Sequence, residues 1–258
     1  MEDEILVEET KKVFYITLNR PEKLNAINFN MMRQIEKYLI EAEENEKIKL
    51  IVFKGAGDRA FSTGFDTSQI LTMSPEKKTD FWQMNLNVSE MVLTSEKLSM
   101  VLIRRLAMAA GFAFCLFADF RVAEDNPNIY FTLPEISLGI FPYSILALGN
   151  YYLPPSIATG LIFGGDKLTL ARADELGLIH RKFKPEVFEK STKKYIRSIT
   201  SQNTKVQRMA KICCNLERKI ILDQMRMEED FTQACLDPES LTYEKIKNLK
   251  KKWSENCD

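Results

Sequence analysis

The chain has 258 residues, and 45% of them are hydrophobic, which is enough to bury the core of one large domain or of two small ones. Its 36 basic and 36 acidic side chains cancel, so no overall positive field exists to attract nucleic acid or an anionic membrane surface. The first residues are acidic, unlike a secretory signal, and no window reaches the ~18 uninterrupted apolar residues of a membrane span, so we expect a cytoplasmic protein that binds neither nucleic acid nor membrane.

The first third of the chain alternates strand and helix patterns. Alternating apolar residues over 5–19 predict a β-hairpin that turns near residues 10–12. Residues 28–45 carry apolar side chains on one face of a predicted helix. Residues 50–54 are mostly apolar and include β-branched residues, which predicts a buried strand. This order of elements is typical of an α/β domain.

The same alternation continues into the middle of the chain. Residues 75–96 have the apolar spacing of a helix, and residues 100–103 predict the next short strand. The helix expected after Gly111 is hydrophobic on nearly every side, which places it inside the core of a large domain. Residues 119–123 lead out of that helix.

The last third of the chain is mainly helical. Helices are expected over residues 156–163 and 169–176, followed by a long helical region from Pro185 to the end. No Pro-, Gly- or Ser-rich tract marks a flexible linker. We therefore divide the chain into a core of residues 1–195 and a C-terminal helical region of residues 196–258.

Cysteine and histidine content limits the chemistry. The five cysteines are odd in number and lack CxxC spacing, which argues against a disulfide framework or a zinc site. The single histidine, His180, lies in a short strand-like segment without an obvious partner, so a structural role is favoured over acid–base chemistry. One histidine also disfavours Ser-His-Asp hydrolysis and histidine-rich metal sites, and we expect no bound metal.

Two small-residue turns point to the chemistry. Residues 60–66 (Ala-Phe-Ser-Thr-Gly-Phe-Asp) follow an apolar run, and residues 107–111 (Ala-Met-Ala-Ala-Gly) open the apolar helix. Main-chain N–H groups in two such turns suit an oxyanion hole, which holds the oxygen of a thioester carbonyl as it becomes an enolate. The plainer alternatives are a positive φ at Gly64 and close packing of a helix onto a sheet at the second turn.

A carboxylic acid near those turns would complete such a site. Glu135, in Thr-Leu-Pro-Glu-Ile-Ser-Leu-Gly, is the best candidate. The alternative for Glu135 is a helix-capping or surface carboxylate that follows a proline.

Five segments in a fixed order resemble the crotonase, or enoyl-CoA hydratase/isomerase, superfamily. They are residues 16–26, 60–66, 118–123, 134–139 and 171–179. The resemblance implies an α/β crotonase-like spiral of ββα units, followed by a C-terminal helical region that packs against neighbouring subunits in a homotrimer or hexamer. It also implies an acyl-CoA thioester as substrate, with no cofactor beyond its coenzyme A moiety.

The resemblance also assigns residues to the site. The main-chain amides of Phe65 and Ala110 are expected to bind the thioester oxygen, and Glu135 to transfer the proton. The residues expected to bind the coenzyme A moiety are Lys23, Leu24, Ala26, Ala60, Ser62, Thr63, Gly64, Asp66 and Gly111.

The chain departs from this family in three places. The second turn, usually a run of glycines, has Ala109 and Ala110 before Gly111, and alanine is strained by roughly 1 to 2 kcal/mol where φ must be positive. Ala113 occupies the position of one of the two glutamates of hydratases, which weakens hydration as a hypothesis. Residues 141–146 replace a glycine-rich segment, so the acyl pocket is expected to have an unusual shape.

One carboxylate suffices for an isomerase-type enzyme, in which Glu135 removes a proton from one acyl carbon and returns it to another. The pKa of Glu135 must then be raised by apolar neighbours, for which the candidates are Phe131, Leu133, Ile136, Phe141 and Tyr143. Two alternatives stay open. One is a hydratase, decarboxylase or thioester hydrolase that uses the same site, and the other is a non-catalytic acyl-CoA-binding or structural homologue.

Overall fold

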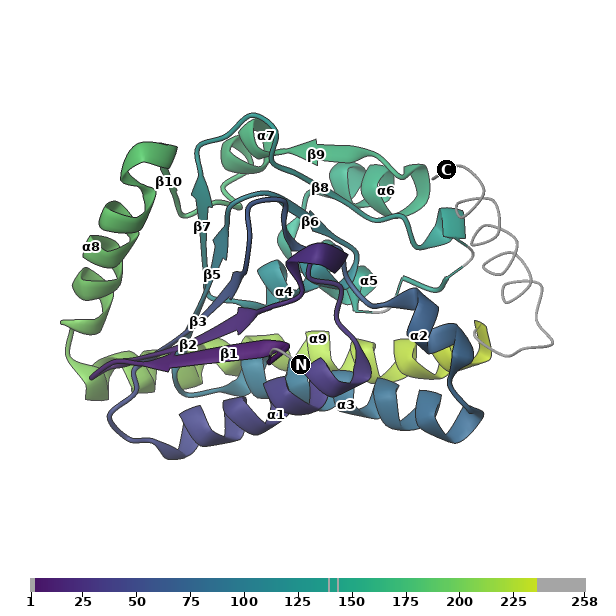
Figure 1. The fold of residues 1–258 in the computed structure, drawn as a ribbon, viewed down its shortest axis with the longest axis horizontal. Helices are drawn as coiled ribbons and strands as arrows, with labels where there is room; N and C mark the ends of the chain where they lie inside the picture. The colour runs from purple at the N-terminus through teal and green to yellow at the C-terminus, as the bar shows by residue number, and fades with distance from the viewer. Residues whose placement is uncertain (1–2, 139, 143, 236–258) are drawn as a thin grey trace.

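The computed structural model describes residues 3–138, 140–142 and 144–235. Two β-sheets form the centre of the molecule and helices surround them (Figure 1). The strands are β1 (Ile5–Glu9), β2 (Val13–Leu18), β3 (Leu50–Gly55), β4 (Ala60–Ser62), β5 (Leu98–Ile103), β6 (Leu106–Met108), β7 (Phe120–Glu124), β8 (Tyr130–Thr132), β9 (Lys167–Thr169) and β10 (Arg181–Phe183). The α-helices are α1 (Phe29–Glu44), α2 (Thr67–Thr72), α3 (Pro75–Thr94), α4 (Ala110–Phe117), α5 (Ile145–Tyr152), α6 (Pro155–Gly164), α7 (Leu170–Glu175), α8 (Phe188–Thr200) and α9 (Thr204–Cys235).

The first sheet has the strand order β1-β2-β3-β5-β7-β10. Strands β1 and β2 form the antiparallel hairpin that the apolar alternation predicts, with Ile5 opposite Leu18. The other neighbours in this sheet are parallel, so each connection must cross from one end of the sheet to the other. Helices α1 and α3 are parts of these crossings.

The expected helical faces are buried. The N-terminus of α1 is capped by Asn28, whose side-chain oxygen accepts a hydrogen bond from the N–H of Met31 at 2.8 Å. Met31, Ile35 and Leu39 then face the core, as their spacing predicts. Helix α4 is buried from Gly111 to Phe117, which confirms that a helix without a polar face lies inside the domain.

The two C-terminal helices cover different parts of the molecule. Helix α8 packs on the face of the first sheet opposite to α1, where Phe188 and Ile196 join Val52 and Met100 in a second hydrophobic cluster. Helix α9 runs alongside α3 and contacts α5 (Figure 1). The boundary that we placed between residues 195 and 196 falls within α8.

Helix α9 is fastened to the first sheet by a buried ion cluster. Asp119, between α4 and β7, pairs with Lys211 and with Arg218, whose Nη1 lies 2.9 Å from Asp119 Oδ1. Desolvation by burial raises the pKa of Asp119, but the two cations together outweigh it and hold that pKa below its usual value. Breaking such a buried pair leaves an uncompensated charge, so the cluster fixes the position of α9.

His180 has a structural place just before β10. Its Nδ1 accepts a hydrogen bond from the N–H of Arg121 at 3.2 Å, and its ring packs edge-on against Phe120. Burial, assisted by the charges of Arg121 and Arg181, lowers the pKa of His180 to about 4. The ring is therefore neutral at physiological pH.

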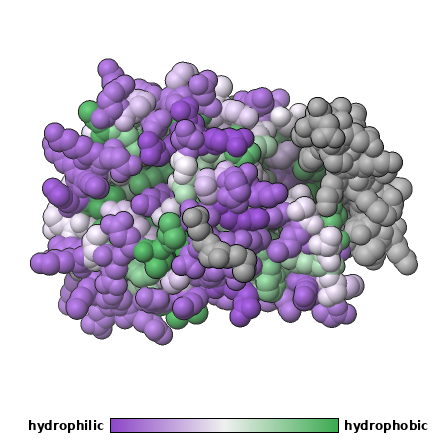
Figure 2. All heavy atoms as spheres, in the orientation of Figure 1, coloured by the Kyte–Doolittle hydropathy of each residue, from purple (hydrophilic) through white to green (hydrophobic). Residues whose placement is uncertain are grey.

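The surface agrees with the balanced composition. In Figure 2, polar residues cover most of the visible face, and hydrophobic residues form small separate groups. Within the described ranges, no helix combines the length and the apolar character that crossing a bilayer requires.

Candidate active site

The second sheet brings the two small-residue turns together. Its strand order is β4-β6-β8-β9, and β4 pairs in parallel with β6. Parallel neighbours end at the same edge of a sheet, so the residues that follow β4 and β6 become neighbours. A Cβ atom built on Gly64 would lie 3.0 Å from the main-chain nitrogen of Ala110. Gly64 has φ +90°, the positive φ that the plainer alternative required of this residue.

Two main-chain N–H groups at this edge have no acceptor in the part of the chain that the structure describes. Phe65 forms a parallel bridge with Ile27, but the bonds of that bridge use the carbonyl of Gly64 and the N–H of Asp66, so the N–H of Phe65 points to the other side. Ala110 is the first residue of α4, where an N–H has no partner within the helix. Among the described residues neither group finds an acceptor, and both residues line one cavity.

The strain that we expected in the second turn falls on Ala109. This residue has φ 50° and ψ −130°, a conformation that glycine adopts more readily than alanine, at a cost of about 1 to 3 kcal/mol. Hydrogen bonds hold it there, because its N–H donates to the carbonyl of Thr132 and its own carbonyl accepts from Phe112 and Ala113. The turn therefore keeps its positive-φ conformation although alanine replaces the glycines usual in the family.

Gly111 is required for packing. A Cβ atom on Gly111 would lie 2.4 Å from the carbonyl oxygen of Ser62, far closer than atoms can approach. The start of α4 therefore packs directly against β4. The same close packing brings the N–H group of Ala110 near that of Phe65.

Glu135 lies on the same edge of the second sheet. It follows β8, which pairs in parallel with β6. Only 9% of Glu135 is exposed, and its Oε2 has no hydrogen-bond partner among the described residues. Desolvation by burial raises the pKa of Glu135 to about 7, against the smaller opposing effect of a hydrogen bond with its own backbone. The surface-carboxylate alternative for Glu135 is wrong.

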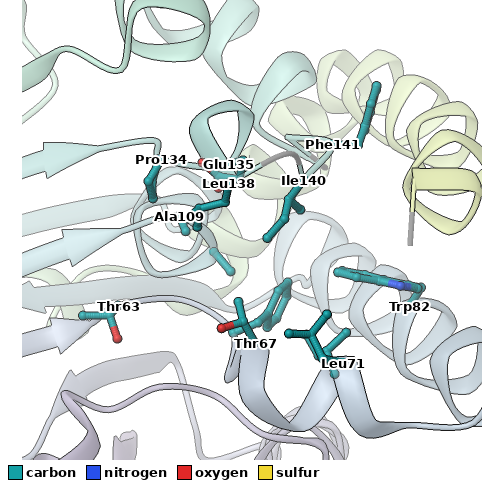
Figure 3. Close-up of a pocket in the computed structure, with 13 residues that line it drawn as sticks. Thr63, Thr67, Leu71, Trp82, Ala109, Pro134, Glu135, Leu138, Ile140 and Phe141 are labelled. Atoms are coloured by element: carbon teal, nitrogen blue, oxygen red, sulfur yellow. The ribbon is translucent and has the colours of Figure 1, made fainter. Parts of the chain in front are cut away.

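The apolar surroundings of Glu135 differ in part from those expected. Phe141 lines the cavity with Glu135, as predicted, and Leu138 and Ile140 join it (Figure 3). Ile136 was a wrong choice, because 41% of it is exposed. Phe131 and Leu133 belong to the main hydrophobic core and are not among the residues that line the cavity, and Tyr143 lies outside the described residues.

The loop expected to bind coenzyme A lies beside the first turn. Leu24 and Asn25 have positive φ angles, and the carbonyl of Leu24 accepts a hydrogen bond from the N–H of Thr63 at 3.2 Å. Arg20 joins the two segments, because its Nη1 donates to the carbonyl of Ala26 at 2.8 Å and pairs with Asp66 at 3.1 Å. The structure therefore brings the predicted loop of residues 23–26 together with residues 60–66.

The predicted binding residues occupy different positions in this arrangement. Thr63 lines the cavity, whereas Lys23 lies exposed on its loop. Ala60 and Ser62 are buried in β4, and the Ser62 hydroxyl donates to the carbonyl of Asn25 at 2.8 Å, so both side chains support the turn. The Asp66 side chain caps the N-terminus of α2.

The cavity residues that come from α2 and α3 were also missed in the sequence. Thr67, Ile70 and Leu71 come from α2, a six-residue helix too short to give a clear periodic signal. Trp82 comes from α3, and its ring lies 5.4 Å from that of Phe65, centroid to centroid. Nothing local in the sequence marks these residues, because their place depends on how α2 and α3 pack on the second sheet.

Comparison with known proteins supplies the family. The sequence profile of the Enoyl-CoA hydratase/isomerase family matches residues 8–247. The chain belongs to this family. Crotonase enzymes act on coenzyme A thioesters without a further cofactor, which agrees with the ligand that the resemblance implies.

Relatives of this enoyl-CoA hydratase/isomerase family member are named for different reactions. Crotonyl-CoA hydratase of Syntrophomonas wolfei is 25% identical over 238 residues, which cover 90% of each chain. Human mitochondrial 3-hydroxyisobutyryl-CoA hydrolase is 34% identical over 155 residues, 59% of this chain, and the match spans only 39% of that protein. The crystal structure of an enoyl-CoA hydratase from Mycobacterium avium subsp. paratuberculosis superposes with a TM-score of 0.84 at 20% identity, over 97% of this chain and 96% of that one. The crotonase fold that we expected is confirmed.

Proposed function

We propose that this protein binds an acyl-CoA thioester with its carbonyl oxygen between the N–H groups of Phe65 and Ala110, and that Glu135 transfers a proton beside it. The observation that carries the proposal is that two N–H groups without an acceptor in the described part of the chain, and the buried carboxyl group of Glu135 with its Oε2 unbonded there, surround a single cavity. Fixed donors of this kind stabilise a developing enolate oxygen by roughly 3 to 4 kcal/mol each.

The reaction that this geometry supports best is isomerisation of an enoyl-CoA. The Glu135 carboxylate takes a proton from the carbon next to the thioester carbonyl, and the negative charge moves to the oxygen held by the two amides. The resulting acid then returns the proton to the far end of the conjugated system, which moves the double bond from the β,γ to the α,β position. A pKa of about 7 suits a group that must both accept and donate a proton near neutrality.

Hydration of an α,β-enoyl-CoA is the second candidate. The name of the full-length relative from Syntrophomonas wolfei, a crotonyl-CoA hydratase, favours hydration over isomerisation. Against it stands Ala113, a fully buried residue where hydratases of the family carry a second glutamate. With only Glu135 to orient water, hydration must proceed with one acid–base group.

Substrate consumption separates these candidates. The protein is incubated with a β,γ-enoyl-CoA, an α,β-enoyl-CoA and a malonyl-type thioester, and the products are identified by mass and by absorbance of the conjugated thioester. We expect conversion of the β,γ-enoyl-CoA to its α,β isomer. Formation of a 3-hydroxyacyl-CoA as the main product would favour hydration, release of free coenzyme A would favour hydrolysis, and loss of carbon dioxide would favour decarboxylation. Binding of all three without turnover would favour the non-catalytic alternative.

We also propose that copies of the chain associate through α9 into a trimer or hexamer. Five apolar residues on this helix are each at least 58% exposed and recur at the spacing of one helical stripe: Val206, Met209, Leu216, Ile220 and Met227. A long exposed apolar stripe is costly in water, and a second copy would cover it. Sedimentation analysis is expected to give three or six chains per particle, and a monomer at micromolar concentration would contradict the proposal.

A further inference from the structure

The cavity has two distinct ends. In Figure 3, Thr63 lies at one end, Ala109 and Glu135 lie in the middle, and Trp82 lies at the other end. The Thr63 end is continuous with the loop predicted to bind coenzyme A, because the N–H of Thr63 donates to the carbonyl of Leu24. If the thioester lies beside Glu135, as the proposed function requires, the acyl chain extends from Glu135 toward Trp82.

Trp82 is held firmly at its end of the cavity. Only 3% of it is exposed, and its ring packs edge-on against Phe65 at 5.4 Å and Phe81 at 5.1 Å. Phe65 and Phe81 also contact each other edge-on at 5.0 Å, so each of the three rings touches the other two. Such mutual contacts restrain each ring, because moving one of them sacrifices two favourable aromatic pairs. Trp82 therefore forms a wall that does not easily move aside.

The space in front of this wall is small. The whole cavity, including the parts beside Thr63 and Glu135, has a volume of about 90 Å³, so the part in front of Trp82 is smaller still. For comparison, a dry protein cavity of about 150 Å³ accepts benzene, which has six carbon atoms, so in proportion this cavity has room for roughly four. The apolar side chains of Leu71 and Ile140 line the cavity on the side of Trp82 (Figure 3). The space suits a short hydrocarbon chain.

We propose that the substrate is a short-chain acyl-CoA, with an apolar acyl group of about four carbons, and that Trp82 sets this limit. The proposal rests on the proposed function for the direction in which the acyl chain lies. Forcing a longer chain against a packed wall requires displaced side chains, an effect that lowers affinity by roughly ten- to a hundredfold.

Binding of unreactive saturated thioesters tests this limit without any need for turnover. The dissociation constants of butyryl-CoA and octanoyl-CoA are measured by calorimetry for the wild-type protein and for Trp82→Leu, which shortens the wall. The control is Leu86→Ala, which removes bulk from a buried position of the same helix that is not among the residues lining the cavity. Circular dichroism confirms that each variant is folded, and Trp82→Phe provides a milder change if Trp82→Leu is not.

We expect the wild-type protein to bind butyryl-CoA at least about tenfold more tightly than octanoyl-CoA. The Trp82 variants are expected to lower this ratio, whereas Leu86→Ala leaves it unchanged. Equal affinity of the wild-type protein for the two thioesters, an unchanged ratio in the Trp82 variants, or no binding of either thioester would overturn the proposal. Preferential binding of butyryl-CoA without turnover of any enoyl-CoA would leave the chain-length limit standing and refute the proposed reaction alone.

Discussion

Gly64 and Ala110 approach so closely that a methyl group on Gly64 would lie 3.0 Å from the Ala110 nitrogen and 2.7 Å from the Ala109 Cβ. The residues lie 46 positions apart in the chain, yet this contact sets the separation of the two unpaired N–H groups. Any side chain at residue 64 must push the turns apart, and it must also adopt φ +90°.

Gly64→Ala is therefore expected to lower kcat/KM by about a hundredfold, the effect of losing one oxyanion donor. The matched control is Gly165→Ala. Gly165 also has a positive φ, 66°, but a Cβ there would meet no atom within 4 Å. The positive φ is expected to cost each variant about 1 to 2 kcal/mol of stability, with a further loss in Gly64→Ala from the close contacts with Ala109 and Ala110, and only Gly64→Ala loses activity. Equal kinetics of the two variants would show that the spacing of the turns does not matter.

Removing the carboxyl group of Glu135 is expected to stop proton transfer. Glu135→Gln keeps the shape of the side chain, and turnover should fall by roughly 10² to 10⁴ with little change in acyl-CoA affinity. Glu228→Gln is a matched control, because burial raises the pKa of Glu228 to about 7 as well. Unlike Glu135, Glu228 accepts a hydrogen bond from the N–H of Ala147 and is not among the residues that line the cavity. Steady-state kinetics and calorimetry measure the two effects. Undiminished turnover in Glu135→Gln would remove this residue from the mechanism.

The raised pKa of Glu135 predicts how stability depends on pH. Between pH 4.5 and about 7 the folded protein keeps a proton on Glu135 that the unfolded chain releases, so stability falls as pH rises through this window. In the wild-type protein this loss in the free energy of unfolding is on the order of 3 kcal/mol for Glu135, and Glu135→Gln should abolish it. The pH dependence that remains in the variant includes the similar contribution of Glu228, whose pKa is also raised. Urea denaturation at pH 5 and pH 8 measures the difference. A variant whose pH dependence matches that of the wild-type protein would contradict the burial of a protonated acid.

The strained turn at Ala109 predicts a stabilising change. Ala109→Gly relieves the φ 50°, ψ −130° conformation and is expected to raise the free energy of unfolding by about 1 to 2 kcal/mol. Ala173→Gly is a suitable control, since Ala173 lies in helix α7, where glycine should destabilise by about 1 kcal/mol. Chemical denaturation measures both variants. A loss of stability in Ala109→Gly would mean that the turn does not need a glycine conformation.

Periodic segments were predictable from the sequence. The hairpin, α1 and α3 repeat their apolar residues over several turns or strand positions, and burial follows that repeat. Helix α4 is apolar throughout, which predicts its burial without a repeat. Strands β4, β6 and β8 have three residues each, too few for any repeat, so the second sheet was not predicted. Those strands are defined by pairing between distant segments, which local propensity does not encode.

The site was predictable in its polar part and not in its apolar part. Phe65, Ala110 and Glu135 follow recognisable turns, and the structure places all three around one cavity. The wall at Trp82 depends on aromatic packing between α3 and the first turn, which no short motif records. Their functional roles remain predictions, because position alone does not establish chemistry.

The central claim is that two main-chain N–H groups hold the thioester oxygen beside Glu135. A crystal structure with butyryl-CoA bound tests this claim most directly. We predict that the thioester oxygen lies about 2.7 to 3.1 Å from the nitrogens of both Phe65 and Ala110, with the Glu135 carboxyl group against the neighbouring acyl carbon. A thioester oxygen bound to other donors, or an acyl chain outside this cavity, would contradict the account.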